Sequence, residues 1–252
     1  MAKGRAKMAM AEGVSVWVLE APQGFGDADY HSHHAIQITV SLAGSLSLTA
    51  RGKTVAAQSL AVAADELHRF EADGLLAFIF VEPESRPGRA LARQLFVDEP
   101  LVELGHPSVN ELLEPLRETF DAPLGRDALL GAGRAAVEAL APGTEPRLFD
   151  PRVQKIIDYA ASNLDGPLSL EQAATGIHLS PSRLRHLFVE QTGLAFKTYL
   201  LWLRLVKAVQ TYSEEGCTLT EAAHVAGFAD SAHFSRVFKR TFGLPATTLT
   251  RI

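Results

Sequence analysis

A pair of short helices is encoded twice in about the last hundred residues, and this repeat constrains the fold more than any other feature. The second copy, residues 217–245, reads CTLTEAAHVAGFADSAHFSRVFKRTFGLP. Thr218 and Glu221 have the spacing of a capping box, after which apolar residues recur at helical spacing until Gly227. Asp230 then predicts the start of a second helix whose apolar residues face inward.

The outward face of this second helix is rich in hydrogen-bond donors and cations. It carries Ser231, His233, Ser235, Arg236 and Arg240. Two short helices joined by a tight glycine turn fit a helix-turn-helix, in which the second helix lies in the major groove of DNA. An ordinary αα-hairpin fits the same pattern, because most helix pairs with a glycine between them bind no nucleic acid.

The first copy lies about fifty residues upstream, at 168–193, and reads LSLEQAATGIHLSPSRLRHLFVEQTG. Ser169 and Gln172 repeat the capping box, while Ser180 and Pro181 predict the cap and first residue of a second helix. Arg183, Arg185 and His186 stand on its outward face. Between the copies, FKTYLLWLRLVKAVQTY predicts one long helix. Repetition of the unit favours DNA reading over a simple hairpin.

The residues of both copies and of the long helix resemble the AraC family of transcription regulators. The resemblance rests on Gly193, Phe196, Tyr199, Arg204, Leu205, Ala208, Ala222, Ala223, Gly227, Phe228, Ser231, Phe234, Arg236, Phe238, Lys239, Phe242 and Gly243. It implies two helix-turn-helix units bridged by a rigid helix, with reading helices about one turn of DNA apart. Pro245 and Arg251 each depart by one position from the family's closing pattern.

The resemblance also implies roles for single residues. Base edges would be read by Ser182, Arg185 and His186 in the first unit and by Ala232, His233 and Arg236 in the second. Arg183, Lys197, Lys239 and Arg240 are better placed for phosphates. The partners implied are double-stranded DNA and RNA polymerase.

The net charge of −5 hides an asymmetry that matters for DNA binding. From Asp150 onward, 11 lysines and arginines face 9 acidic residues, whereas residues 1–149 hold 13 against 20. The C-terminal part is therefore weakly basic, and phosphate contacts depend on such local cations. With no long apolar run and a single cysteine, Cys217, the chain is expected to be a cytoplasmic protein without a membrane span or an internal disulfide.

The N-terminal half, from about Val14 to Glu82, predicts short β-strands with frequent turns, as in a small barrel or sandwich. Within these strands His31, His33 and His34 cluster, and His68 comes after two more strands. Because side chains alternate along a strand, His31 and His33 should share one face and His34 the other.

This half resembles a cupin barrel, a sensor domain that often precedes AraC-type DNA domains. The pattern reads here as Gly26, His31, His33, Gln37 and Gly44, with His68 where the second motif has its histidine and Ala63, Ala64 and Asp65 replacing a Pro-x-Gly turn. The resemblance implies a divalent metal, zinc, nickel or iron, on the histidines and the residue at position 37. Gln37 departs from the usual glutamate, so a ligand pocket lined by the same histidines is the alternative.

Residues 84–146 predict two amphipathic helices after a turn. Their apolar faces hold Val109, Leu112, Leu113 and Leu116 in the first and Leu129, Leu130, Ala136, Val137 and Leu140 in the second. These faces either cover the barrel or, as the resemblance implies, pair two subunits in a homodimer. Asp150 and Pro151 predict the start of the next helix.

The predicted architecture is α+β with two domains. Residues 1–85 form a cupin-like sensor barrel, 86–146 a helical coupling and dimerisation segment, and 147–252 an all-α DNA-binding domain with two helix-turn-helix units bridged by a long helix. The predicted function is a sequence-specific DNA-binding transcription regulator with a small-molecule or metal effector, not an enzyme. The alternative is a metal-dependent cupin enzyme fused to a DNA-binding domain, against which Gln37 counts because catalytic cupins normally need a carboxylate there. A carbohydrate-binding module leaves two reading helices unexplained.

Overall fold

A computed structural model describes residues 6–11, 13–21, 24, 29–105, 110–122, 125–142, 150–214 and 216–249. The chain divides into two compact units. The first, here called the sheet unit, comprises Met1–Pro146 together with Phe238–Ile252, and the second, the helical unit, comprises Arg147–Val237. No helix among the described residues is long and apolar enough to cross a membrane.

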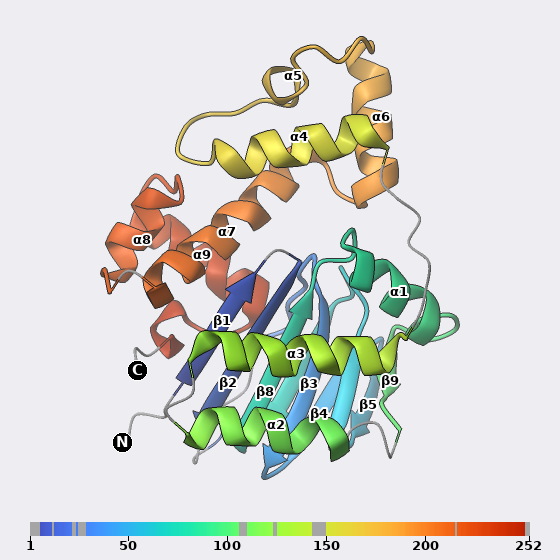
Figure 1. Ribbon diagram of the computed structural model, residues 1–252, viewed down its shortest axis with the longest axis vertical. Coiled ribbons are helices and arrows are strands. Elements are labelled where there is room, and N and C mark those ends of the chain that lie inside the picture. Colours follow the sequence, from blue (N-terminus) through green and yellow to red (C-terminus); the bar gives the residue numbers. More distant parts are fainter. Residues whose placement is uncertain are drawn as a thin grey trace. The chain divides into compact units, whose positions relative to one another are not determined.

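The described residues of the sheet unit form two antiparallel sheets (Figure 1). The larger has the strand order β1-β2-β8-β3-β6-β9 and the smaller has the order β5-β4-β7. The strands are β1 Ala6–Ala11, β2 Val14–Ala21, β3 Ile36–Ala43, β4 Leu46–Ala50, β5 Lys53–Ala56, β6 Ser59–Val62, β7 His68–Ala72, β8 Gly74–Val81 and β9 Leu101–Glu103. A sheet-rich N-terminal part and a helical C-terminal part are as predicted. Closure into a cupin barrel stays a prediction.

Before residue 146, the described part of the sheet unit has three helices: α1 Arg86–Leu95, α2 Asn110–Asp121 and α3 Arg126–Leu140. Figure 1 shows α2 and α3 side by side across the large sheet, and α3 packs against β1 and β2. Lys7 of β1 donates hydrogen bonds to the carbonyl oxygens of Thr119 and Ala122, at 2.8 and 2.7 Å. A cation that satisfies the last carbonyls of α2 stabilises that end of the helix.

The apolar faces of α2 and α3 are used inside the sheet unit, so the predicted dimer contact through them is wrong for the described residues. Leu116 is fully buried, and Leu129, Ala136 and Val137 are at most 3% exposed in the same core as Val16 and Ile38. Leu130 and Leu140 pack against that core. Val109 and the side chains of Leu112 and Leu113 lie outside the described residues. Of the two readings of these helices, covering the sheet is confirmed.

The helical unit is built from helices of different lengths, the longest of which is α7. They are α4 Pro151–Ser162, α5 Leu170–Ala173, α6 Pro181–Thr192, α7 Phe196–Glu214, α8 Leu219–Val225 and α9 Ser231–Phe242, of which α9 continues into the sheet unit. A short 3-10 helix, η1 Ala246–Thr248, follows. The core around α6 and α7 includes Phe188, Tyr199 and Ile156.

The predicted caps are confirmed. Both capping boxes form reciprocally, Ser169 with Gln172 at α5 and Thr218 with Glu221 at α8. Ser180 caps α6 ahead of a proline, and Asp150 caps α4 in the same way. Because each cap satisfies backbone N–H groups that a helix leaves unpaired, the starts of these helices could be predicted from the sequence.

Arg204 of α7 joins three parts of the helical unit. Its guanidinium donates to the carbonyl oxygens of Leu164 and Gly166, at 3.1 and 2.6 Å, in the loop after α4. Gly227, which follows α8, lies against the same loop with φ +81°, and a methyl group there would overlap the carbonyl oxygen of Leu164. The turn between α8 and α9 therefore requires glycine both for its left-handed backbone and for this close approach.

Candidate functional site

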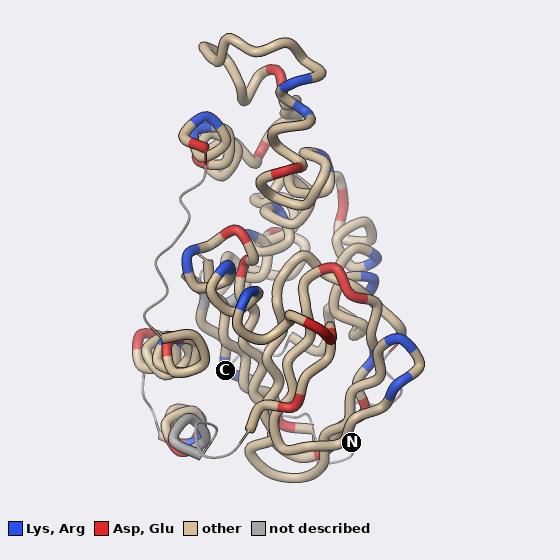
Figure 2. Tube along the Cα trace, turned by 90° about the vertical axis from the view of Figure 1, so that its right-hand side faces the viewer, with Lys and Arg blue, Asp and Glu red and all other residues tan. Residues whose placement is uncertain are grey.

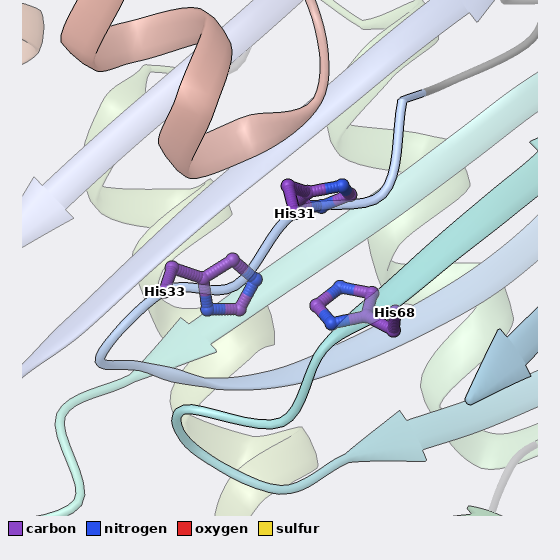
Figure 3. A group of neighbouring side chains, drawn as sticks. All are labelled: His31, His33 and His68. Carbon is purple, nitrogen blue, oxygen red and sulfur yellow. The ribbon is translucent and has the colours of Figure 1, made fainter. Parts of the chain in front are cut away.

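Three buried histidines converge inside the sheet unit (Figure 3). His31 and His33 lie in the segment before β3, and His68 is the first residue of β7. Backbone hydrogen bonds join His31 and His68 in both directions at 2.9 Å, which fixes their separation. Each histidine offers a ring nitrogen within 4.8 Å of the other two. We call His31, His33 and His68 the histidine cluster.

Each ring of the histidine cluster is oriented by a backbone carbonyl. The Nδ1 atoms of His31, His33 and His68 lie 2.8 Å from the carbonyl oxygens of Asp29, Ala35 and Glu66, respectively. A carbonyl only accepts, so each Nδ1 carries the proton and donates it. In a neutral ring the Nε2 atom is then left as a lone-pair donor, which is the form that ligates a metal.

Gln37 completes the group from β3. Its Oε1 lies 2.9 Å from His33 Nε2 and 3.4 Å from His68 Nε2, while its Nε2 donates to Thr39 Oγ1 at 2.9 Å. In this orientation the amide oxygen of Gln37 lies next to two unprotonated ring nitrogens. All three atoms are hydrogen-bond acceptors, so no donor lies between them. The conflict disappears if the amide is turned by half a rotation, or if a cation lies between them.

Burial keeps the histidine cluster neutral. It lowers the pKa of His31 to about 4, with the neighbouring His33 acting in the same direction. The pKa of His33 is lowered by burial despite its hydrogen bond to Gln37, and the pKa of His68 is lowered well below its usual value by burial and by the other two rings. At neutral pH the rings therefore need no deprotonation before binding a cation.

His34 is not part of the histidine cluster, and since residues 32–35 do not form a strand, the predicted alternation along a strand does not apply to it. Its Nε2 lies 2.7 Å from Glu84, both side chains being at most 4% exposed, and its Nδ1 lies 3.6 Å from Asp65. Burial alone would lower the pKa of His34, but these two carboxylates outweigh it and raise the pKa to about 9. Asp65 adopts φ +61° at the place where the cupin pattern has glycine.

The opposite pKa shifts predict a bell-shaped dependence of stability on pH. Since the pKa of His34 is raised, protonation of His34 stabilises the folded state. This contribution to the free energy of unfolding, ~3 kcal/mol, is complete below about pH 6.5 and is lost as the pH rises to about 9. Since the pKa of His31 is lowered, stability falls as the pH drops from about 6.5 towards 4. The free energy of unfolding, measured by urea titration between pH 5 and 9.5 in the presence of a metal chelator, checks this pH dependence.

The matched variant for the alkaline branch is His34→Gln. It should be less stable overall, because Glu84 stays buried without its partner, but its stability should change less between pH 6.5 and 9. An alkaline branch of equal depth in both proteins would contradict the assignment.

The first group of predicted DNA-reading residues lies on the exposed face of α6. Ser182, Arg183, Arg185 and His186 are all exposed, whereas Leu184 and Phe188 of the same helix are buried. Arg185 pairs with Glu171 of α5 at 2.9 Å, with side chains 64% and 48% exposed. An ion pair this exposed contributes little to stability.

The second group lies on α9. Ala232, Ser235, Arg236 and Arg240 are exposed, and Ser231 and His233 are half-buried. Asp230 accepts a hydrogen bond from the backbone N–H of His233 at 2.6 Å, which caps the helix, and the His233 ring contacts Phe228 with centroids 5.4 Å apart. Lys239 pairs with Asp29 at 2.8 Å. Figure 2 shows lysines and arginines interspersed with acidic residues along the described chain.

Comparisons with known proteins match the C-terminal part. A family model described as a helix-turn-helix domain covers residues 173–252. The HTH-type transcriptional regulator GbdR of Pseudomonas aeruginosa is 32% identical over 95 residues, 38% of this chain and 26% of that protein. The uncharacterized HTH-type transcriptional regulator YpdC of Escherichia coli is 32% identical over 130 residues, 52% of this chain and 45% of that protein. The chain thus spans less than half the length of these relatives.

A solved structure resembles the whole chain. The crystal structure of ToxT from Vibrio cholerae O395 is 13% identical, covers 99% of both chains and has a TM-score of 0.58, which shows a shared fold. The HTH-type transcriptional activator RhaS of Escherichia fergusonii is 36% identical over 94 residues, 37% of this chain and 34% of that protein. The C-terminal part of the chain is therefore similar to the helix-turn-helix domains of several transcription regulators, and the chain as a whole shares the fold of ToxT.

Proposed function

We propose that the protein is a sequence-specific DNA-binding transcription regulator whose cupin-like sheet unit senses a divalent cation at the histidine cluster. The observation that supports DNA reading is the repeat of a capped short helix followed by a twelve-residue helix, α5–α6 and α8–α9, with polar and cationic side chains exposed on the second helix of each pair. These pairs act as two helix-turn-helix units joined by α7.

Arginine is the residue that gives the sharpest test of base reading. Its guanidinium makes two parallel hydrogen bonds to guanine O6 and N7, an arrangement that no other base offers. Arg185 on α6 and Arg236 on α9 are exposed and stand on the outward faces. Arg183 and Arg240, exposed on the same helices, are assigned to phosphates.

We expect Arg185→Ala and Arg236→Ala each to weaken operator binding by about 1–3 kcal/mol and to relax the preference at one base pair. Arg183→Ala and Arg240→Ala serve as controls, since loss of a phosphate contact weakens specific and nonspecific binding alike and lowers the salt slope by about 1. Fluorescence anisotropy on a selected operator and on a scrambled duplex, at several salt concentrations, measures both. Equal losses on the two duplexes for Arg236→Ala would reassign it to phosphate.

The sensing proposal rests on three buried imidazoles that each offer a ring nitrogen within 4.8 Å of the other two, with each Nδ1 hydrogen-bonded to a carbonyl oxygen. Imidazole nitrogens suit zinc, nickel and iron, and the Gln37 oxygen would add a neutral fourth ligand. The same residues could line a pocket for an organic effector. One ToxT crystal structure holds an unsaturated fatty acid, but a neutral, buried cluster of lone pairs attracts cations rather than carboxylates.

Two parts of the resemblance stay proposals. Contact with RNA polymerase is one, and the homodimer is the other. Because the described apolar residues of α2 and α3 lie inside the core, a dimer has to use other surfaces. Light scattering at micromolar concentration decides whether one forms, and a monomeric mass with and without DNA would exclude it.

A further inference from the structure

The chain folds its own C-terminal residues against the histidine cluster. Phe238–Ile252 belongs to the same compact unit as the sheets. Gly243, directly after α9, is buried with φ +71°, and a methyl group built on it would lie 2.5 Å from His31 Nδ1, 2.8 Å from His31 Cε1 and 3.1 Å from the carbonyl oxygen of Asp29. In Figure 3 the ribbon coloured as the C-terminal residues passes beside the His31 ring. Only glycine allows the backbone this close.

The last turn of α9 supplies an aromatic wall next to this contact. The ring of Phe242 lies 4.8 Å from Trp17, 5.4 Å from Phe80 and 6.1 Å from His33, measured between centroids. The ring of Phe238 stacks on Trp17 at 6.1 Å and 9°. Phe238 and Phe242 are 1% and 6% exposed, so the wall excludes water from that side of the cluster.

Asp29 connects the two sides. Its carbonyl oxygen accepts the Nδ1 proton of His31, and its carboxylate pairs with Lys239 of α9 at 2.8 Å. The ion pair is exposed and adds little energy by itself. Its geometry matters more, because the backbone of Gly243 lies against the hydrogen bond between Asp29 and His31 that orients the His31 ring.

We infer that Phe238, Phe242 and Gly243 are positioning residues of the cation site, so that filling the site and seating the last turn of α9 stabilise each other. This inference rests on the proposed cation binding. Groups that orient a metal-ligating histidine through its other nitrogen typically change metal affinity by about 10- to 100-fold. Coupling between two equilibria is reciprocal, so the cation in turn holds in place the last turn of α9.

The test compares Gly243→Ala with Gly193→Ala. Gly193 follows α6 as Gly243 follows α9, with φ +77°, but no described atom lies within 4 Å of a methyl group there. Both variants therefore strain a left-handed residue, and only one displaces a contact with His31. Zinc affinity is measured in the full chain by competition with a chromophoric chelator. We expect Gly243→Ala to bind zinc about 10- to 100-fold more weakly, and Gly193→Ala to match the wild type within about twofold.

Phe242→Leu removes the ring but keeps an apolar side chain. It provides a second test in case Gly243→Ala does not fold, and it should also weaken zinc binding. Seating is followed separately by Trp17 fluorescence in a Trp202→Phe background, which should change on zinc addition. If wild type and both variants bind zinc equally well, the inference is wrong while the cation site stands. If the wild type binds no zinc, nickel or iron, the cation site and the inference fall together.

Discussion

Gly227→Ala is expected to lower the free energy of unfolding of the helical unit by about 3 kcal/mol or more, and to abolish operator binding at 37 °C as a result. Two causes add. An alanine in the left-handed region costs about 1–2 kcal/mol, and its methyl group would overlap the backbone oxygen of Leu164, which Arg204 already holds. Since a buried carbonyl cannot swing aside as a flexible side chain can, the loop or the helix has to move. Urea unfolding followed by circular dichroism measures the loss.

Gly176→Ala is the matched control for this prediction. Gly176 follows α5 in the first helix pair, as Gly227 follows α8 in the second, and its φ of +82° is nearly the same as that of Gly227. No described atom lies within 4 Å of a methyl group at Gly176, so its replacement carries the backbone strain alone. We expect a loss of about 1–2 kcal/mol. Equal losses in the two variants would mean that the packing against Leu164 contributes nothing.

His68→Ala is expected to remove cation binding altogether, the largest functional change that one substitution in the sheet unit should cause. His68 supplies one of three imidazoles, and its loss leaves two nitrogens and a neutral amide oxygen, too few good ligands for zinc, nickel or iron. Gln37→Glu should act in the opposite direction, because a carboxylate adds a charged oxygen ligand to an otherwise uncharged site. Elemental analysis after equilibration with each metal measures both.

His178→Ala is the control for adventitious histidine binding, because His178 is exposed in the helical unit. Its metal content should equal that of the wild type. Retention of a full equivalent of metal by His68→Ala would place the ion elsewhere in the chain.

The sequence predicted most of the helical unit because its signals are local. Ser169 and Thr218 mark helix starts because each forms a capping box with the residue three positions further on. Since the helix pair is repeated, the same pattern occurs twice in the sequence. The edge strand β1 was missed, since alanine, methionine and lysine are weak strand formers and Ala6–Ala11 is held by pairing with β2. The amphipathic face of α2 was visible, but whether it met a sheet or a second subunit was not, since both bury the same apolar residues.

The candidate site divides in the same way. Spacing and resemblance brought together His31, His33, Gln37 and His68, and the structure places their polar atoms side by side. Gly243 and Asp29 were not associated with these histidines, because Gly243 reaches the cluster from about 200 residues away and contacts it through its backbone. A contact made by a residue without a side chain leaves no periodicity or charge pattern in a sequence.

The central claim, that two reading helices recognise one operator, is tested most directly by hydroxyl-radical footprinting on a duplex selected from a random library. Two protected tracts about one helical turn apart, on one face of the duplex, are predicted. Arg185→Ala and Arg236→Ala should each weaken protection mainly at a different tract. A single protected tract, or protection that both variants weaken at the same base pairs, would contradict the account.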